Sequence, residues 1–161
     1  MIDSAVILGL PELLSARVRG CARAEDYVAV AQNALEAGFD NPTTLTLAIE
    51  EPPFFTPDLD RLLGKMLSEC RIQEPTADQA LIHHARIVAA EIVAGAVTPV
   101  AGAEKIAEIF TLDHTPEGFR AWTIIAEGLR CEYCRESASQ GHESFESAIL
   151  AEAEGLLRVA V

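Results

Sequence analysis

The stretch Cys131-Glu132-Tyr133-Cys134 has the only spacing in this chain that is typical of a chemical site. Two thiolates separated by two residues can share a metal ion or form a redox pair, and His142 follows as a third ligand for such a metal. A structural zinc site uses four ligands, and no second pair stands at a familiar spacing. The alternative is that a helix continues through Cys131 and Cys134 and packs at least one thiol as a small hydrophobe. We therefore expect no cofactor, with zinc as the alternative.

Two adjacent histidines, His83 and His84, form the second group of titratable side chains. Neighbouring positions on a helix point about 100° apart, so the pair cannot chelate one metal through ordinary rotamers. Glu91 shares a side with His84 but lies two turns away, roughly 10 Å along the axis. The chain also lacks an HExxH motif, a glycine-rich phosphate loop and a GxSxG elbow. These observations favour a protein without enzymatic activity.

The third group is an apolar segment flanked by carboxylates, Glu50-Glu51-Pro52-Pro53-Phe54-Phe55 with two aspartates shortly after it. Exposed aromatic rings beside acidic residues would form a docking patch for a basic protein. The alternative is that the rings pack on the core and the carboxylates form an ordinary solvated face. The candidate binding residues are Glu50, Glu51, Phe54, Phe55, Asp58 and Asp60.

The elements that must position these groups are helices. Four prolines directly follow a good N-cap residue, and proline suits the first helical turn: Asn41-Pro42, Thr56-Pro57, Thr98-Pro99 and Thr115-Pro116. No stretch alternates cleanly enough to predict a strand. We expect an all-α fold, a single domain over residues 1–161 with about seven or eight short helices. The expected ranges are 11–19, 23–37, 43–50, 57–70, 77–94, 100–110, 116–135 and 144–159.

The helix expected at about 77–94 is apolar over most of its circumference, which is typical of a central, buried helix. Thr76 and Gln79 form a capping box at its start, and Gly95 suits the left-handed residue that ends it. Leu81 and Val88 belong to its apolar side. A membrane span is the alternative for this stretch, but a span needs about 20 continuous apolar residues and the break at Gly95–Pro99 interrupts the window.

Composition limits the partners and the compartment. The chain has 161 residues, and 25 acidic against 12 basic side chains give a formal net charge of −13. Nucleic acid and anionic lipid attract clusters of Lys and Arg, so we expect neither as a partner. The first residues lack the positive n-region of a signal peptide, and four cysteines in a chain of this size do not indicate a disulfide scaffold. We expect a cytoplasmic protein with reduced thiols.

The stretch from Ala85 to Ile106 resembles a helix–turn–helix phrase found in small uncharacterised bacterial all-helical proteins. The resemblance implies helices and carries no catalytic residues. The leading hypothesis is a non-enzymatic, acidic, helical protein-interaction or regulatory protein, immunity-like in that it would neutralise a basic protein partner. The alternative is a metal-binding protein or metalloenzyme that uses Cys131 and Cys134. The large apolar fraction leaves room for a homodimer.

Overall fold

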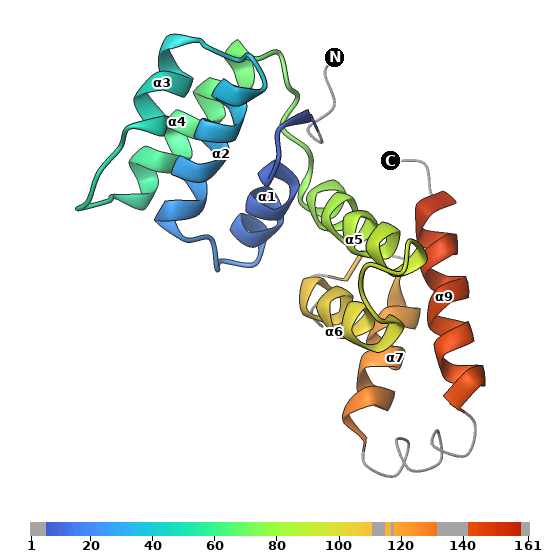
Figure 1. Cartoon of the computed structure of the whole chain (residues 1–161). Coiled ribbons are helices and arrows are strands. Elements are labelled where there is room, and N and C mark those ends of the chain that lie inside the picture. Colours follow the sequence, from blue (N-terminus) through green and yellow to red (C-terminus); the bar gives the residue numbers. More distant parts are fainter. Residues whose placement is uncertain (1–5, 111–114, 117, 132–141, 159–161) are drawn as a thin grey trace. The chain divides into compact units, whose positions relative to one another are not determined.

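The computed structural model describes residues 6–110, 115–116, 118–131 and 142–158, and it contains helices but no strand in these ranges (Figure 1). The all-α expectation is therefore confirmed. The described helices are α1 (Leu10–Val18), α2 (Ala24–Glu36), α3 (Pro42–Ala48), α4 (Thr56–Glu69), α5 (Ala77–Val93), α6 (Pro99–Ile109), α7 (Arg120–Arg130) and α9 (His142–Arg158). Within the same ranges, no helix combines the length and the apolarity that crossing a membrane requires.

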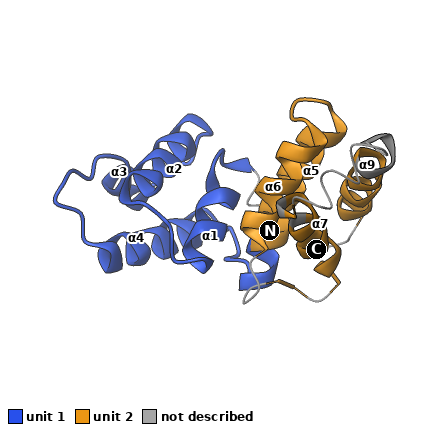
Figure 2. Cartoon of the chain, turned by 90° about the horizontal axis from the view of Figure 1, so that it is seen from below, with its two compact units in different colours: residues 1–80 blue, residues 81–161 orange. Residues whose placement is uncertain are grey.

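The chain divides into two compact units, residues 1–80 and 81–161 (Figure 2). Unit 1 holds α1 to α4 and the first turn of α5, and unit 2 holds the rest of α5 with α6, α7 and α9. The boundary thus lies inside the helix that the sequence predicts as central. The expectation of one domain over 1–161 stays a prediction.

In unit 1, α2 packs against α1, α3 and α4, and α3 also packs against α4. The pattern of α4 explains its place, because its apolar residues recur every three or four positions and form one buried stripe. Each fully buried leucine contributes about 1.5–3 kcal/mol relative to an exposed one. The largest buried side chains of this core include Leu10, Leu13, Tyr27, Leu47, Leu63, Met66 and Leu67.

Polar side chains fix the start of α3 against the end of α4. Asn41 caps α3 by accepting the Thr44 N–H at 2.9 Å. The Thr43 hydroxyl, which is buried, donates to a Glu69 oxygen of α4 at 2.8 Å. A carboxylate at a helix N-terminus also interacts favourably with the helix dipole. Hydrogen bonds thereby hold the start of α3 against the end of α4.

In unit 2, α6 packs against α7 and α9, and α7 contacts α9. The predicted apolar side of α5 is buried, and the Arg86 guanidinium on its polar side donates to the Leu157 carbonyl of α9 at 3.2 Å. Gly102 of α6 lies so close to Ile92 of α5 that an added Cβ would overlap the isoleucine side chain. The buried core includes Leu81, Ala85, Val88, Ile92, Ile106, Phe110, Trp122 and Ile149.

The cap signals succeed at some helix starts and fail at others. Thr76 and Gln79 form the predicted capping box, with hydrogen bonds of 3.0 and 3.3 Å. The prediction for Thr56 is wrong by one residue, since Phe55 is the N-cap and Thr56 already belongs to α4. The prediction for Pro116 is also wrong, because α7 begins at Arg120. Gly118 has a φ of 94°, a left-handed conformation that interrupts any helix running from 116.

Candidate functional site

The segment between α3 and α4 presents apolar and acidic side chains together at the surface. Ile49 is 76% exposed and Phe55 is 65% exposed, although both are large and apolar. Glu51 and Asp58 are also exposed, and Glu50 is partly exposed. We refer to Ile49, Glu50, Glu51, Phe55 and Asp58 as the 49–58 surface. Four of the six predicted binding residues are thus exposed or partly exposed between Ile49 and Asp58, the last of them in the first turn of α4, and their binding role stays a prediction.

The other two predicted binding residues have different surroundings. Phe54 is partly buried and packs against the core of unit 1, so it anchors the segment on which Phe55 is exposed. Asp60 lies within α4, where its carboxylate is bonded to side chains of α1 and α2. Phe55 is therefore exposed, as a docking patch requires, whereas Phe54 packs on the core, as the alternative predicts.

Asp60 belongs to a hydrogen-bonded network of four side chains from α1, α2, α4 and the segment before α5. The Arg17 Nε donates to Asp60 Oδ1 at 2.8 Å, and Arg17 Nη1 donates to Glu74 Oε1 at 2.9 Å. The Tyr27 hydroxyl donates to the same Asp60 Oδ1 at 2.6 Å. Such charge-assisted hydrogen bonds are shorter and stronger than neutral ones, so the network holds both carboxylates in fixed orientations.

The network shifts the protonation of two of its members. Burial acts to lower the pKa of Arg17, but the hydrogen bond to Glu74 and the charges of Asp60 and Glu74 outweigh it and raise the pKa. Burial of the Tyr27 phenol, with its hydrogen bond to Asp60, raises the pKa of Tyr27 well above its ordinary value. Both groups therefore keep their protons at neutral pH, and the local charge is that of two carboxylates and one guanidinium.

A cavity of about 490 Å³ opens beside this network and lies wholly within unit 1. All four network residues line it, and the remaining wall is mainly apolar, with Leu14 and Val18 among its residues. Cavities of roughly 300–1,000 Å³ with a few convergent polar groups are typical of small-molecule sites. This cavity has both properties.

Only part of the predicted metal site falls on residues that the structure describes. Cys131 is the C-cap of α7 and is partly buried, so α7 ends at Arg130, and residues 132–135 of the expected helix lie outside the described part of the chain. Cys134 lies outside the described residues, and so does the side chain of His142. Among the side chains that are described, no three His, Cys, Asp or Glu residues are grouped to hold a metal ion. The zinc hypothesis stays a prediction.

Sequence reasoning identified Asp60 but missed its partners, Arg17, Tyr27 and Glu74. They come from three separate segments, and Arg17 is 43 residues from Asp60 and 57 from Glu74. Helical periodicity indicates which side of each helix faces inward, but it does not indicate which helices become neighbours. One signal was present, because Arg17 is a charged residue adjacent to the apolar stripe of α1.

No protein-family model, curated protein or solved structure matches this chain.

Proposed function

We propose that this chain is an acidic protein-interaction or regulatory module whose partner is a protein with a basic surface. The observation that carries the proposal is the 49–58 surface, where Phe55 and Ile49 expose large apolar side chains on the same short stretch of chain as exposed acidic residues. Apolar anchors surrounded by charge are typical of protein interfaces, because the rings supply buried area and the charges supply selectivity.

Charge favours a basic partner over a neutral one. The formal net charge of −13 steers cationic proteins toward the molecule over a distance that salt controls. Glu51 and Asp58 are exposed and lie within four residues of Phe55 along the chain, so a Lys or Arg of the partner could form an ion pair at the rim of the surface. Neutralisation of a toxic or otherwise active basic protein would be a function of this kind.

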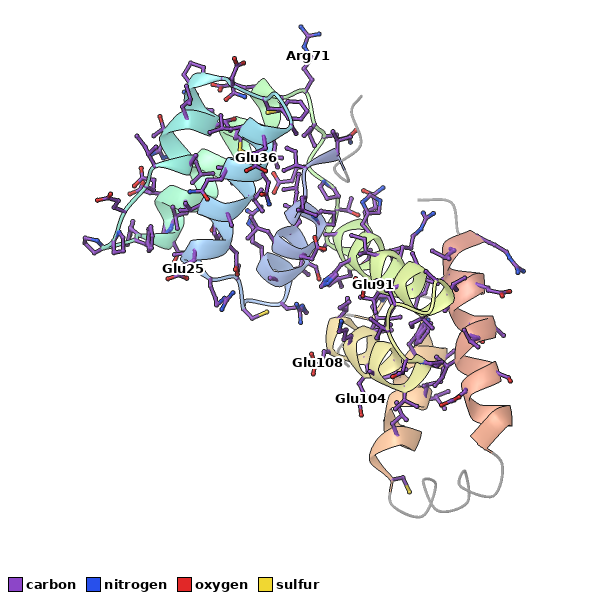
Figure 3. The ribbon with its side chains drawn as sticks, viewed as in Figure 1. Glu25, Glu36, Arg71, Glu91, Glu104 and Glu108 are labelled. Carbon is purple, nitrogen blue, oxygen red and sulfur yellow. The ribbon has the colours of Figure 1, made fainter. Side chains whose placement is uncertain are left out.

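The test compares two double variants with the same change in charge and a similar loss of exposed apolar surface. Glu51→Lys with Phe55→Ser alters the 49–58 surface. Glu104→Lys with Ile124→Ser alters unit 2, where Glu104 projects from α6 (Figure 3) and Ile124 is 68% exposed on α7. Both variants and the native chain would be used as bait for lysate proteins, with bound proteins identified by mass spectrometry.

The proposal expects one basic protein to be retained by the native chain and by the unit 2 variant, and lost with the 49–58 variant. Retention should weaken as salt rises from about 0.05 M to about 0.5 M, because the Debye length falls several-fold over that range. Equal retention by all three baits, or binding that is indifferent to salt, would refute the proposal.

A further inference from the structure

The charged side chains that line the cavity of unit 1 have a net negative charge. Asp60 and Glu74 place two carboxylates at its wall, and Arg17 supplies the single cation between them. The Asp60 and Glu74 side chains remain 40% and 51% exposed, so a ligand can reach them. The site therefore carries about one uncompensated negative charge and attracts a cation.

One oxygen of each carboxylate accepts all the hydrogen bonds that the described residues make to that side chain. Asp60 Oδ1 accepts from Arg17 and Tyr27, and Glu74 Oε1 accepts from Arg17. None of the described residues donates to Asp60 Oδ2 or Glu74 Oε2. Because Tyr27 and Arg17 already fix the orientation of these groups, the two open oxygens are held in place before a ligand arrives, which reduces the entropic cost of binding.

The apolar part of the cavity wall and the cavity volume limit which kind of ligand fits. Leu14, Val18 and Ala77 contribute apolar surface, and the volume of about 490 Å³ exceeds what a simple inorganic ion fills. A primary ammonium group has three donors and no acceptor, so it suits a cavity wall that carries carboxylate oxygens, and its alkyl chain suits the apolar residues of the same wall.

We propose that the cavity of unit 1 is a binding site for an alkyl ammonium group, held by the open oxygens of Asp60 and Glu74. The same group is carried by small organic amines and by a lysine side chain of another protein. This site differs from the 49–58 surface, and it requires no partner protein for its test, so either proposal can fail while the other stands.

The test uses n-hexylamine as the probe and n-hexanol as its neutral counterpart, titrated into the full chain and followed by amide NMR shifts. The amine is protonated at neutral pH because alkyl amines have pKa values near about 10. We expect saturable shifts at Gly20, Ala22 and Ala77, which line the cavity, with the amine and not with the alcohol. A lysine-containing neutral peptide and its acetylated form serve as a second arm that distinguishes the two sources of the ammonium group.

The decisive variant is Glu74→Gln, which removes one charge from an exposed side chain and keeps an acceptor for Arg17. It should weaken amine binding by about tenfold or more, since a charge-assisted hydrogen bond becomes a neutral one. Glu36→Gln is the matched control, because exposed Glu36 lies nine residues after Tyr27 on α2, roughly 13 Å along the helix axis (Figure 3).

Tighter binding of the lysine peptide than of hexylamine would identify a protein side chain as the occupant, and the reverse would identify a free amine. Either result supports the site if Glu74→Gln weakens it and Glu36→Gln does not. The proposal is overturned if neither probe gives saturable shifts, if hexanol produces the same shifts, or if the two variants bind equally. Thermal unfolding of each variant would verify that the fold is retained.

Discussion

Substituting Gly102 by alanine tests the packing of α5 against α6. Alanine in place of an unstrained helical glycine normally stabilises a helix by about 1 kcal/mol. At Gly102 the new Cβ would overlap the Cγ1 and Cδ1 atoms of Ile92, a buried side chain that cannot move into solvent. Overpacking of a core costs about 1–3 kcal/mol. We therefore expect Gly102→Ala to lower the free energy of unfolding by up to about 2 kcal/mol.

Gly155 of α9 provides the control in the same unit. A Cβ on Gly155 would meet no heavy atom within 4 Å beyond its own stretch of helix, so Gly155→Ala should stabilise the protein by about 0.5–1 kcal/mol. The two variants should thus change stability in opposite directions although the chemical change is the same.

The assay is urea unfolding followed by the fluorescence of Trp122, the single tryptophan of the chain, which is buried in unit 2. Repeating the substitution in an Ile92→Ala background removes both overlapping atoms. There, Gly102→Ala should become stabilising, and the difference between the two backgrounds measures the contact itself. If Gly102→Ala and Gly155→Ala shift the urea midpoint in the same direction and by a similar amount, α5 and α6 do not approach each other as closely as described.

Three further predictions concern unit 1 and the cysteines. Tyr27→Phe removes one of the hydrogen bonds to Asp60 and should lower the free energy of unfolding by about 1 kcal/mol at pH 7, measured by urea unfolding and circular dichroism. Because the pKa of Tyr27 is raised in the folded protein, the native chain should lose its stability advantage over Tyr27→Phe as pH rises above about 10. A stability difference that stays constant up to about pH 12 would contradict this. The side-chain hydrogen bond from the Arg23 guanidinium lowers the pKa of Asp26, so the stabilisation by the ionised carboxylate is present above about pH 4 and lost below it. The difference in unfolding free energy between the native chain and Asp26→Asn should therefore shrink in acid, and a difference that grows would refute this. Elemental analysis of the purified protein should find no stoichiometric zinc, whereas about one equivalent that disappears with Cys131→Ser would establish the metal-binding alternative.

The helices could be predicted from the sequence because their signals are local. The capping box at Thr76 and the cap at Thr98 involve residues three apart, and the structure contains both. The start expected at Pro116 failed because a proline only permits a helix to begin there, while the left-handed Gly118 two residues later prevents it. Local signals therefore predict the existence of helices more reliably than where they begin.

The packing and the cavity could not be predicted, because they depend on which helices become neighbours. The approach of Gly102 to Ile92 is invisible to helical periodicity, which treats glycine only as a weak helix former. The network at Arg17 likewise joins side chains from distant segments, and only Asp60 attracted attention, as one of several carboxylates near an apolar loop. Long-range pairing of this kind is set by tertiary packing.

Photo-crosslinking from two matched positions tests most directly whether the 49–58 surface binds a basic partner. A benzoylphenylalanine at Phe55 keeps an aromatic ring where one is already 65% exposed, and the same residue at Ile124 has a similar exposure in unit 2. We predict a covalent adduct with one basic protein from position 55, suppressed at high salt, and none with that protein from position 124. An adduct with that protein from position 124 and not from 55, or one from 55 that persists unchanged at high salt, would contradict it.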